Sequence, residues 1–203
     1  MTTISRKNNP LATAILALEK ISSATDASGP TGHIRVRNDD EKTILEATDN
    51  FRCLKITTGM IHPTMEPGLY KVSKNKTDLI LTRNPNSDNM RFPDTERTHK
   101  NFLIMESDCE YQIASCVSDQ PAVYQILINS CSAEGIFKFV NMAFVESWTD
   151  IINVAASPVT LKIKRSTNVP VIFEAYNSMF DALYVIMPMS TDTKDIIKTV
   201  KEE

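Results

Sequence analysis

The sequence has few of the residues and patterns on which catalytic proteins depend. Only five of its 203 residues are glycine, and they do not cluster into a loop that could hold a phosphate group. The spaced residues of the common nucleotide-binding, zinc-protease and serine-hydrolase motifs are also missing. We therefore expect a protein that is not an enzyme, and keep an unrecognised small enzyme as the weakest alternative.

Metal-binding residues are scarce and scattered. The four cysteines are Cys53, Cys109, Cys116 and Cys131, and no two of them are separated by only two residues. A zinc site needs clustered cysteine and histidine ligands. The sequence therefore predicts free thiols in a reducing compartment, with no metal and no cofactor.

Long apolar runs and a strong excess of charge are absent as well. No apolar run reaches the roughly 18 residues that a membrane-spanning helix needs, and residues 11–21 are amphipathic rather than continuously apolar. We expect a cytoplasmic protein that does not bind membranes. The formal net charge of −3 gives no global signal for nucleic acid, although a basic stripe can lie on an acidic body.

Two segments have the periodicity of amphipathic helices. The first begins at Pro10, which suits the first helical position, with Asn9 as its N-cap. Its apolar face consists of Leu11, Ala14, Ile15, Leu18 and Ile21. The second covers residues 142–155, and residues 192–201 form a further short helical pattern.

Most of the remaining chain predicts short strands. In residues 33–38, Ile34 and Val36 alternate with Arg35 and Arg37, which predicts a strand with its apolar side inward. The other predicted strands cover residues 43–47, 52–57, 69–73, 79–82, 102–106, 111–117, 123–129, 136–140, 159–164, 171–175 and 183–187. Short strands with turns between them, together with helices, indicate an antiparallel α+β fold.

Four stretches in a fixed order resemble bacterial β sliding clamps. LEATDNFRCL at residues 45–54 is similar to the clamp's middle-domain segment A-T-D-G-H-R-L, and RFPDTER at residues 91–97 is similar to R-F-P-D-Y-x-R at the end of that domain. Val140 and Asn141 open a helix as the F-N segment of the last domain does. LYVIMPM at residues 183–189 is similar to the closing Y-V-V-M-P-M.

The resemblance implies the DNA-clamp fold, with antiparallel sheets, two main helices and a short C-terminal helix. Residues 1–98 correspond to a reduced middle domain, residues 99–190 to a reduced last domain, and residues 191–203 to a C-terminal extension. The family builds closed rings of six domains, so a two-domain subunit would form a homo-oligomeric trimer.

The resemblance also implies a function. A sliding clamp encircles duplex DNA without reading its sequence, and it tethers DNA polymerase and the clamp loader through a groove for short peptides. The alternative is a clamp-fold interaction protein that binds replication or transcription proteins without encircling DNA. Glu146 and Asp150 on the second predicted helix favour the alternative, because acidic side chains repel phosphate.

The resemblance assigns site residues by position. The partner-peptide groove comprises Thr31, Thr48, Asn50, Phe51, Arg52, Cys53, Val185, Met187, Pro188 and Met189. Methionines repack easily, which suits a groove with several partners, whereas core packing is the alternative interpretation. The expected DNA-facing residues are Arg6, Lys7, Lys20, Arg35 and Arg37, although the strand arginines also fit an ordinary solvated face.

Overall fold

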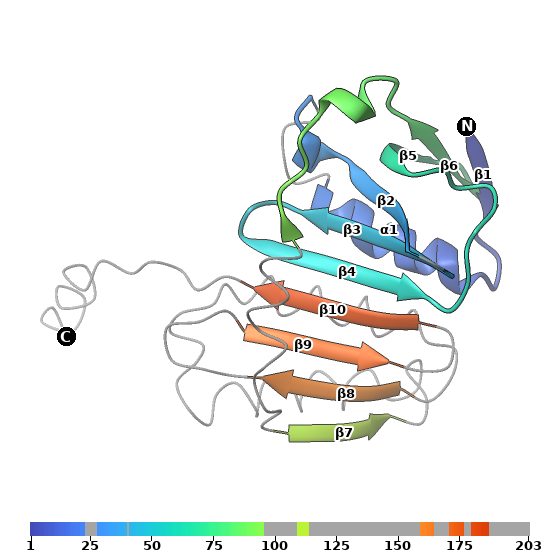
Figure 1. The fold of residues 1–203 in the computed structure, drawn as a ribbon. Helices are drawn as coiled ribbons and strands as arrows, with labels where there is room; N and C mark the ends of the chain where they lie inside the picture. Colours follow the sequence, from blue (N-terminus) through green and yellow to red (C-terminus); the bar gives the residue numbers. More distant parts are fainter. Residues whose placement is uncertain are drawn as a thin grey trace, which may run out of the picture.

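The computed structural model describes residues 1–22, 28–39, 41–95, 109–113, 159–164, 171–176 and 180–186. These residues form one ten-stranded sheet with a single α-helix, α1 (Pro10–Ser22), packed on one face (Figure 1). The strands are β1 (Thr2–Ser5), β2 (Ile34–Asp39), β3 (Lys42–Thr48), β4 (Arg52–Thr58), β5 (Gly68–Lys74), β6 (Asp78–Arg83), β7 (Cys109–Ile113), β8 (Val159–Lys164), β9 (Val171–Tyr176) and β10 (Phe180–Ile186).

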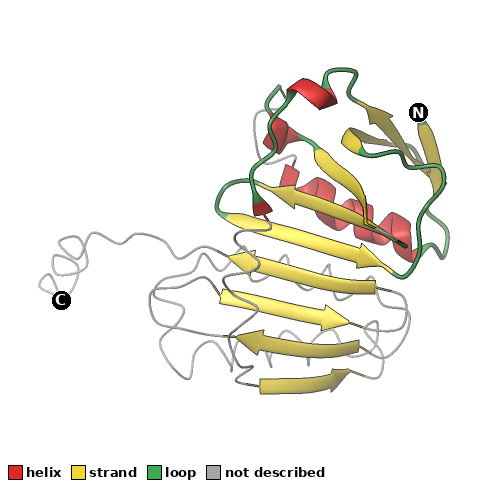
Figure 2. Ribbon diagram, viewed as in Figure 1, coloured by secondary structure: helices red, strands yellow, loops and turns green. Residues whose placement is uncertain are grey.

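The strand order is β1-β6-β5-β2-β3-β4-β10-β9-β8-β7, and each pair of neighbours is antiparallel (Figure 2). The predicted antiparallel α+β class is therefore confirmed for the described part of the chain. The predicted helices over residues 142–155 and 192–201 lie outside the described residues, as do the strands predicted at residues 102–106, 123–129 and 136–140.

Helix α1 begins where its capping residue predicts. The Asn9 side-chain oxygen Oδ1 accepts hydrogen bonds from the backbone N–H groups of Leu11 at 3.1 Å and Ala12 at 3.4 Å. These two donors would otherwise have no partner in the first turn of the helix. Pro10 occupies the first helical position, where its missing N–H has no cost.

The apolar face of α1 forms the centre of the hydrophobic core. Ile15, Leu18 and Ile21 are almost completely inaccessible to solvent, and each contributes roughly 1.5–3 kcal/mol by its burial. The same core includes alternate side chains of β2, β3 and β4, and it continues into β10 through Phe180, Ala182, Tyr184 and Ile186. The helix packs over β2, β3 and β4, and the same core extends past β4 into β10.

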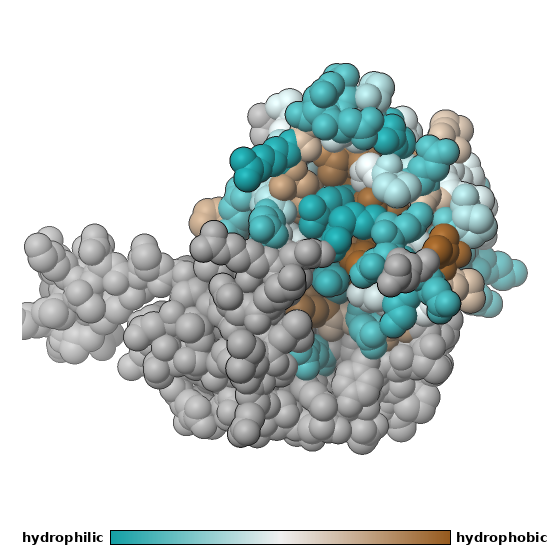
Figure 3. All heavy atoms as spheres, in the orientation of Figure 1, coloured by the Kyte–Doolittle hydropathy of each residue, from teal (hydrophilic) through white to brown (hydrophobic). Residues whose placement is uncertain are grey.

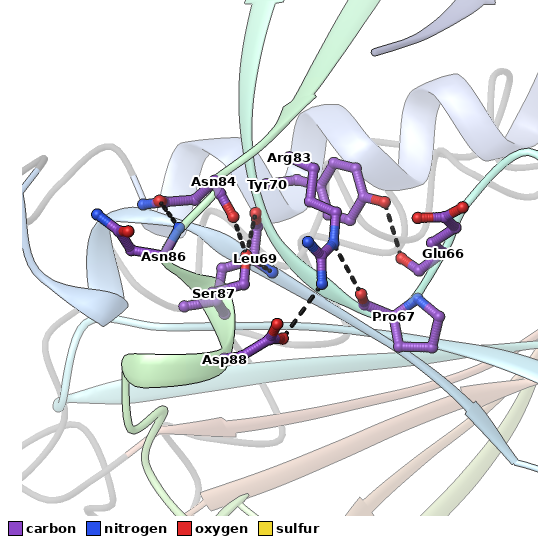
Figure 4. Close-up of polar contacts among 9 residues, drawn as sticks. All are labelled: Glu66, Pro67, Leu69, Tyr70, Arg83, Asn84, Asn86, Ser87 and Asp88. Atoms are coloured by element: carbon purple, nitrogen blue, oxygen red, sulfur yellow. Dashed lines mark hydrogen bonds and ion pairs between the residues drawn. The ribbon is translucent and has the colours of Figure 1, made fainter.

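Polar contacts hold the segment after β6 (Figure 4). This segment contains a short 3₁₀ helix, η2 (Ser87–Asn89), whose Ser87 hydroxyl accepts a hydrogen bond from the Leu69 backbone N–H at 3.2 Å. The Arg83 guanidinium donates to the Pro67 carbonyl at 3.0 Å and to the Asp88 carboxylate at 3.2 Å. These bonds hold the segment against the beginning of β5.

No helix among the described residues combines the length and the apolar character that crossing a bilayer requires.

Candidate functional site

The turn between β3 and β4 is the most densely hydrogen-bonded part of the predicted groove. Asp49 Oδ1 accepts hydrogen bonds from the backbone N–H groups of Phe51 at 3.1 Å and Arg52 at 2.9 Å. The Thr48 hydroxyl donates to the Arg52 carbonyl at 2.8 Å. Asn50 has a φ of 72°, in the left-handed region that asparagine tolerates better than most residues. Hydrogen bonds among its own residues therefore hold the turn in one conformation.

Arg52 links this turn to the strand from the other half of the chain. Its Nε donates to Asp49 Oδ2 at 2.8 Å, and its side chain also forms a hydrogen bond with Tyr184 of β10, which is fully buried. Burial alone would lower the pKa of Arg52, but Tyr184 and Asp49 raise it above its ordinary value. The guanidinium therefore stays charged, and its charge is balanced within the turn.

The pairing of β4 with β10 brings together two stretches that are more than 130 residues apart in sequence. Cys53 lies opposite Val185, and Arg52 lies opposite Ile186, in an antiparallel register. Met187, Pro188 and Met189 follow β10 and lie outside the described residues. Thr31, in the 3₁₀ helix η1 (Pro30–Gly32), is half-buried at the same end of the sheet, because β2 begins beside the end of β3.

Exposure separates the groove residues into two groups. Phe51 is 64% exposed and Asn50 is also exposed, whereas Thr48, Cys53 and Val185 are buried. Burial raises the pKa of the Cys53 thiol far above its ordinary value, and this cysteine forms no disulfide. The surface that the turn offers to a partner is therefore the aromatic ring of Phe51 and the side chain of Asn50.

The two strand arginines of the predicted DNA-facing set are joined to one buried carboxylate. Arg35 Nε donates to Glu46 Oε2 at 2.7 Å, Arg37 Nε donates to the same oxygen at 3.0 Å, and Glu46 is 0% exposed. Thr95 donates to Glu46 Oε1 at 2.7 Å, and the Arg35 guanidinium lies 4.6 Å from the centre of the Phe92 ring. These contacts fasten the RFPDT segment to the sheet.

The predicted DNA-facing residues do not share one face. Ile34 and Val36 belong to the core beneath α1, so Arg35 and Arg37 point to the opposite face of the sheet. Lys20 is exposed on α1, and Arg6 and Lys7 follow β1. A single DNA-contacting wall therefore cannot contain all five residues. Arg35 and Arg37 instead have a structural role, because both bind the buried carboxylate of Glu46.

A basic cluster lies instead at the end of β1. The Arg6 guanidinium donates to the Asn75 carbonyl at 2.9 Å, and the Arg6 backbone N–H donates to Thr77 at 2.8 Å, which places Arg6 and Lys7 beside the turn between β5 and β6. Lys74 pairs with Glu19 of α1 at 3.1 Å, next to Lys20. Sequence reasoning missed Lys74 and Lys76, although the K-N-K triplet between two predicted strands was a usable signal.

The outer surface of the described residues is mainly polar on the face that Figure 3 draws. Figure 3 shows mainly hydrophilic side chains over the face that residues 1–95 present, with small apolar patches between them. Within the described ranges, no group of three or more His, Cys, Asp or Glu side chains is placed to hold a metal ion.

Comparison with known proteins defines the class of fold. No family model matches the sequence, and no curated protein matches it. Among solved structures, the DNA polymerase sliding clamp of Pseudomonas aeruginosa with a ligand has a TM-score of 0.52 at 12% identity, over 93% of this chain and 66% of that one. The Helicobacter pylori beta clamp in complex with 3,4-difluorobenzamide has a TM-score of 0.51 at 12% identity, over 93% and 66%.

A third sliding-clamp structure is similar to the chain to the same degree. The DnaN sliding clamp (DNA polymerase III subunit beta) of Bartonella birtlesii bound to griselimycin has a TM-score of 0.51 at 8% identity, over 97% of this chain and 66% of that one. The chain therefore has the sliding-clamp fold, as its sequence motifs predict. It spans slightly less than two thirds of the length of these clamps.

Proposed function

We propose that the chain is a shortened sliding clamp, a processivity factor without catalytic activity that encircles duplex DNA and tethers replication proteins. The observation that carries the proposal is the pairing of β4 with β10, which sets the turn at residues 48–53 beside Val185 and Ile186. The clamp resemblance assigns a peptide groove to these two stretches, and they come from opposite halves of the chain.

The proposed subunit has two clamp-like units, residues 1–98 and 99–190, followed by an extension at residues 191–203. The β4–β10 pair supports this division, since it joins one strand from each unit into a continuous sheet. In this proposal three subunits close a six-unit homo-oligomeric ring, because closed symmetric rings satisfy every interface.

The peptide groove of the proposal presents a rigid aromatic contact. Hydrogen bonds within residues 48–52 hold the backbone at Phe51, and Arg52 also bonds to Tyr184 of β10, so that little backbone conformational entropy is lost when a partner covers the Phe51 ring. The partners of the proposed clamp are DNA polymerase and the clamp loader, which would dock short apolar peptide ends beside this ring.

The groove can be tested with two variants of equal exposure. Phe51 and Met60 are both 64% exposed, at opposite ends of β4. We expect Phe51→Ala to weaken binding of a fluorescein-labelled, apolar-ended peptide from a bacterial replicative polymerase roughly tenfold, because exposed aromatic anchors carry much of the binding energy of such interfaces. Met60→Ala should leave the affinity unchanged in the same fluorescence-polarisation titration. Equal affinity of the two variants for the peptide would show that Phe51 is not part of a peptide groove.

One observation favours the second candidate, a clamp-fold interaction protein that does not encircle DNA. Helix α1 carries a single basic side chain, Lys20, and its neighbour Glu19 is acidic. A helical wall with so little positive charge offers few phosphate contacts. In this candidate the peptide groove is retained, but the chain does not form a ring around DNA.

A further inference from the structure

A recess lies at the end of the β4–β10 pair that is farthest from Phe51. A cavity of about 300 Å³ opens where α1 begins, where β4 ends and where β10 begins, and Phe180 lies opposite Thr58 there. The seven residues of β4 place it about 20 Å from the turn at residues 48–53. It is therefore separate from the proposed peptide groove.

The walls and the size of the cavity suit a small apolar molecule. Its lining is mainly apolar and includes Leu11, Ala14, Ile56, Met60 and Phe180. A dry cavity of roughly 150 Å³ with similar walls accepts one benzene ring, so twice that volume accommodates about two rings. Met60 is a flexible, exposed side chain at the cavity and can repack around an occupant.

The electrostatics of the cavity select against an anion. No charged side chain lines it among the described residues. The helix amides beside it already have partners, because Leu11 and Ala12 donate to Asn9 Oδ1 and Thr13 donates to the Asn9 carbonyl at 3.2 Å. With no cation in the lining and no open backbone donor at the helix N-terminus, the cavity offers little to offset the desolvation of a full negative charge.

Among the polar side chains of the lining, His62 is available to accept a hydrogen bond from a ligand, because Asn9 Oδ1 already accepts from Leu11 and Ala12. The Thr58 hydroxyl is already engaged, donating to the Met60 carbonyl at 2.7 Å and accepting from the Thr43 backbone N–H at 3.3 Å. The ring nitrogens of His62 have no hydrogen-bond partner within the described part of the chain. Burial lowers the pKa of His62, so its neutral ring presents one acceptor nitrogen at pH 7.

We propose that this cavity binds a small neutral ligand of about two-ring size. The apolar body of the ligand fills the space between α1 and the β4–β10 pair, and a single hydroxyl or amide N–H of the ligand donates a hydrogen bond to His62. Ligand sites of this type combine apolar walls with a few polar groups that fix orientation.

The test uses 2-naphthol, which has two fused rings and one hydroxyl and is uncharged at neutral pH. Chemical shifts of ¹³C-labelled methionine methyl groups report its binding through Met60. Gly59 is exposed, lines the cavity and does not have a positive φ, so Gly59→Leu obstructs the cavity without strain. Thr64→Leu adds the same side chain at an exposed position of the same loop, away from the cavity, and is the matched control.

We expect 2-naphthol to cause a saturable change in the chemical shift of the Met60 methyl group. Gly59→Leu should bind 2-naphthol roughly tenfold more weakly than the wild-type chain, and Thr64→Leu should bind it with unchanged affinity. His62→Leu should weaken 2-naphthol roughly threefold to tenfold while leaving naphthalene unaffected, because only the hydroxyl bond is lost. The anion 2-naphthoate should bind roughly tenfold or more weakly than 2-naphthol.

Three outcomes would overturn the proposal. These are the absence of a saturable shift at Met60, equal affinity of 2-naphthol for the wild-type chain and Gly59→Leu, and equal affinity for 2-naphthol and 2-naphthoate. The first of them would also be seen if the cavity accepted only an apolar side chain of a protein partner. None of these results depends on whether the chain forms a ring around DNA.

Discussion

Glu46 is a buried carboxylate that remains ionised because three side chains compensate its burial. Burial alone would raise its pKa, but the hydrogen bond from Arg37, the charge of Arg35 and the hydrogen bond from Thr95 together hold the pKa below its ordinary value. A carboxylate whose pKa is lower in the folded than in the unfolded state stabilises the fold at neutral pH. Glu46 therefore secures β2, β3 and the RFPDT segment to one another.

Replacing this carboxylate should destabilise the protein in a pH-dependent way. We expect Glu46→Gln to lower the free energy of unfolding by roughly 2–4 kcal/mol at pH 7, because two arginines lose a buried partner. The contribution is complete above the unfolded pKa of about 4.5 and is lost as the pH falls through the lower folded value. Urea denaturation at several pH values measures the difference from wild type.

The control is Glu41→Gln, which neutralises an exposed carboxylate just before β3. It should change the free energy of unfolding by no more than about 0.5 kcal/mol. A Glu46→Gln difference that stayed constant down to the lowest pH at which the protein folds would contradict the assigned ionisation.

Single residues were predictable where local spacing decides their environment. The alternation in residues 34–37 correctly places Ile34 and Val36 in the core and directs Arg35 outward. The partner of Arg35 was not predictable, because Glu46 meets it only through the β2–β3 register. Exposure of Phe51 likewise depends on a turn geometry that its own side chain does not determine.

At the scale of the element, the beginning of α1 depends on one side chain. We expect Asn9→Ala to lower the free energy of unfolding by about 1 kcal/mol, because Leu11 and Ala12 lose the acceptor that caps them. Asn89→Ala removes an exposed asparagine outside α1 and is the control. Thermal denaturation, monitored by circular dichroism, compares the stability of the two variants. If Asn9→Ala lowered the free energy of unfolding by no more than a few tenths of a kcal/mol, Asn9 would not be the cap of the helix.

Elements with a clear internal pattern were predicted, whereas the very short strand β1 was not. The strand predicted at residues 159–164 coincides with β8, and the capped helix at Pro10 coincides with the start of α1. Strand β1 was missed, because Thr2–Ser5 has only four residues and becomes a strand by pairing with β6, more than 70 residues away. The β-strand propensity of four residues does not predict pairing with a strand so distant in sequence.

At the scale of the molecule, a basic cluster lies beside the turn between β5 and β6, whereas α1 carries only Lys20. Lys7 and Lys76 flank the contact between Arg6 and the β5–β6 turn. If this end faces DNA, we expect the double variant Lys7→Gln/Lys76→Gln to weaken binding of a random-sequence duplex and to reduce the slope of log affinity against log salt by about 1–2.

The matched control removes the same charge elsewhere. Lys42 and Lys71 are exposed, and Lys71 lies on the sheet face opposite α1, since its neighbours Tyr70 and Val72 belong to the core. Lys42→Gln/Lys71→Gln should leave the salt slope unchanged in the same fluorescence-anisotropy titration. Equal effects of the two double variants would mean that only net charge matters and that the basic cluster is not a DNA-facing surface.

The most direct test of the proposed ring is the mass of the protein in solution, measured by light scattering over a range of concentrations. A clamp of three two-unit subunits predicts a stable species at three times the chain mass of 22.8 kDa, about 68 kDa. A species that remains at 22.8 kDa at every concentration would contradict a self-closing ring and would favour the clamp-fold interaction protein.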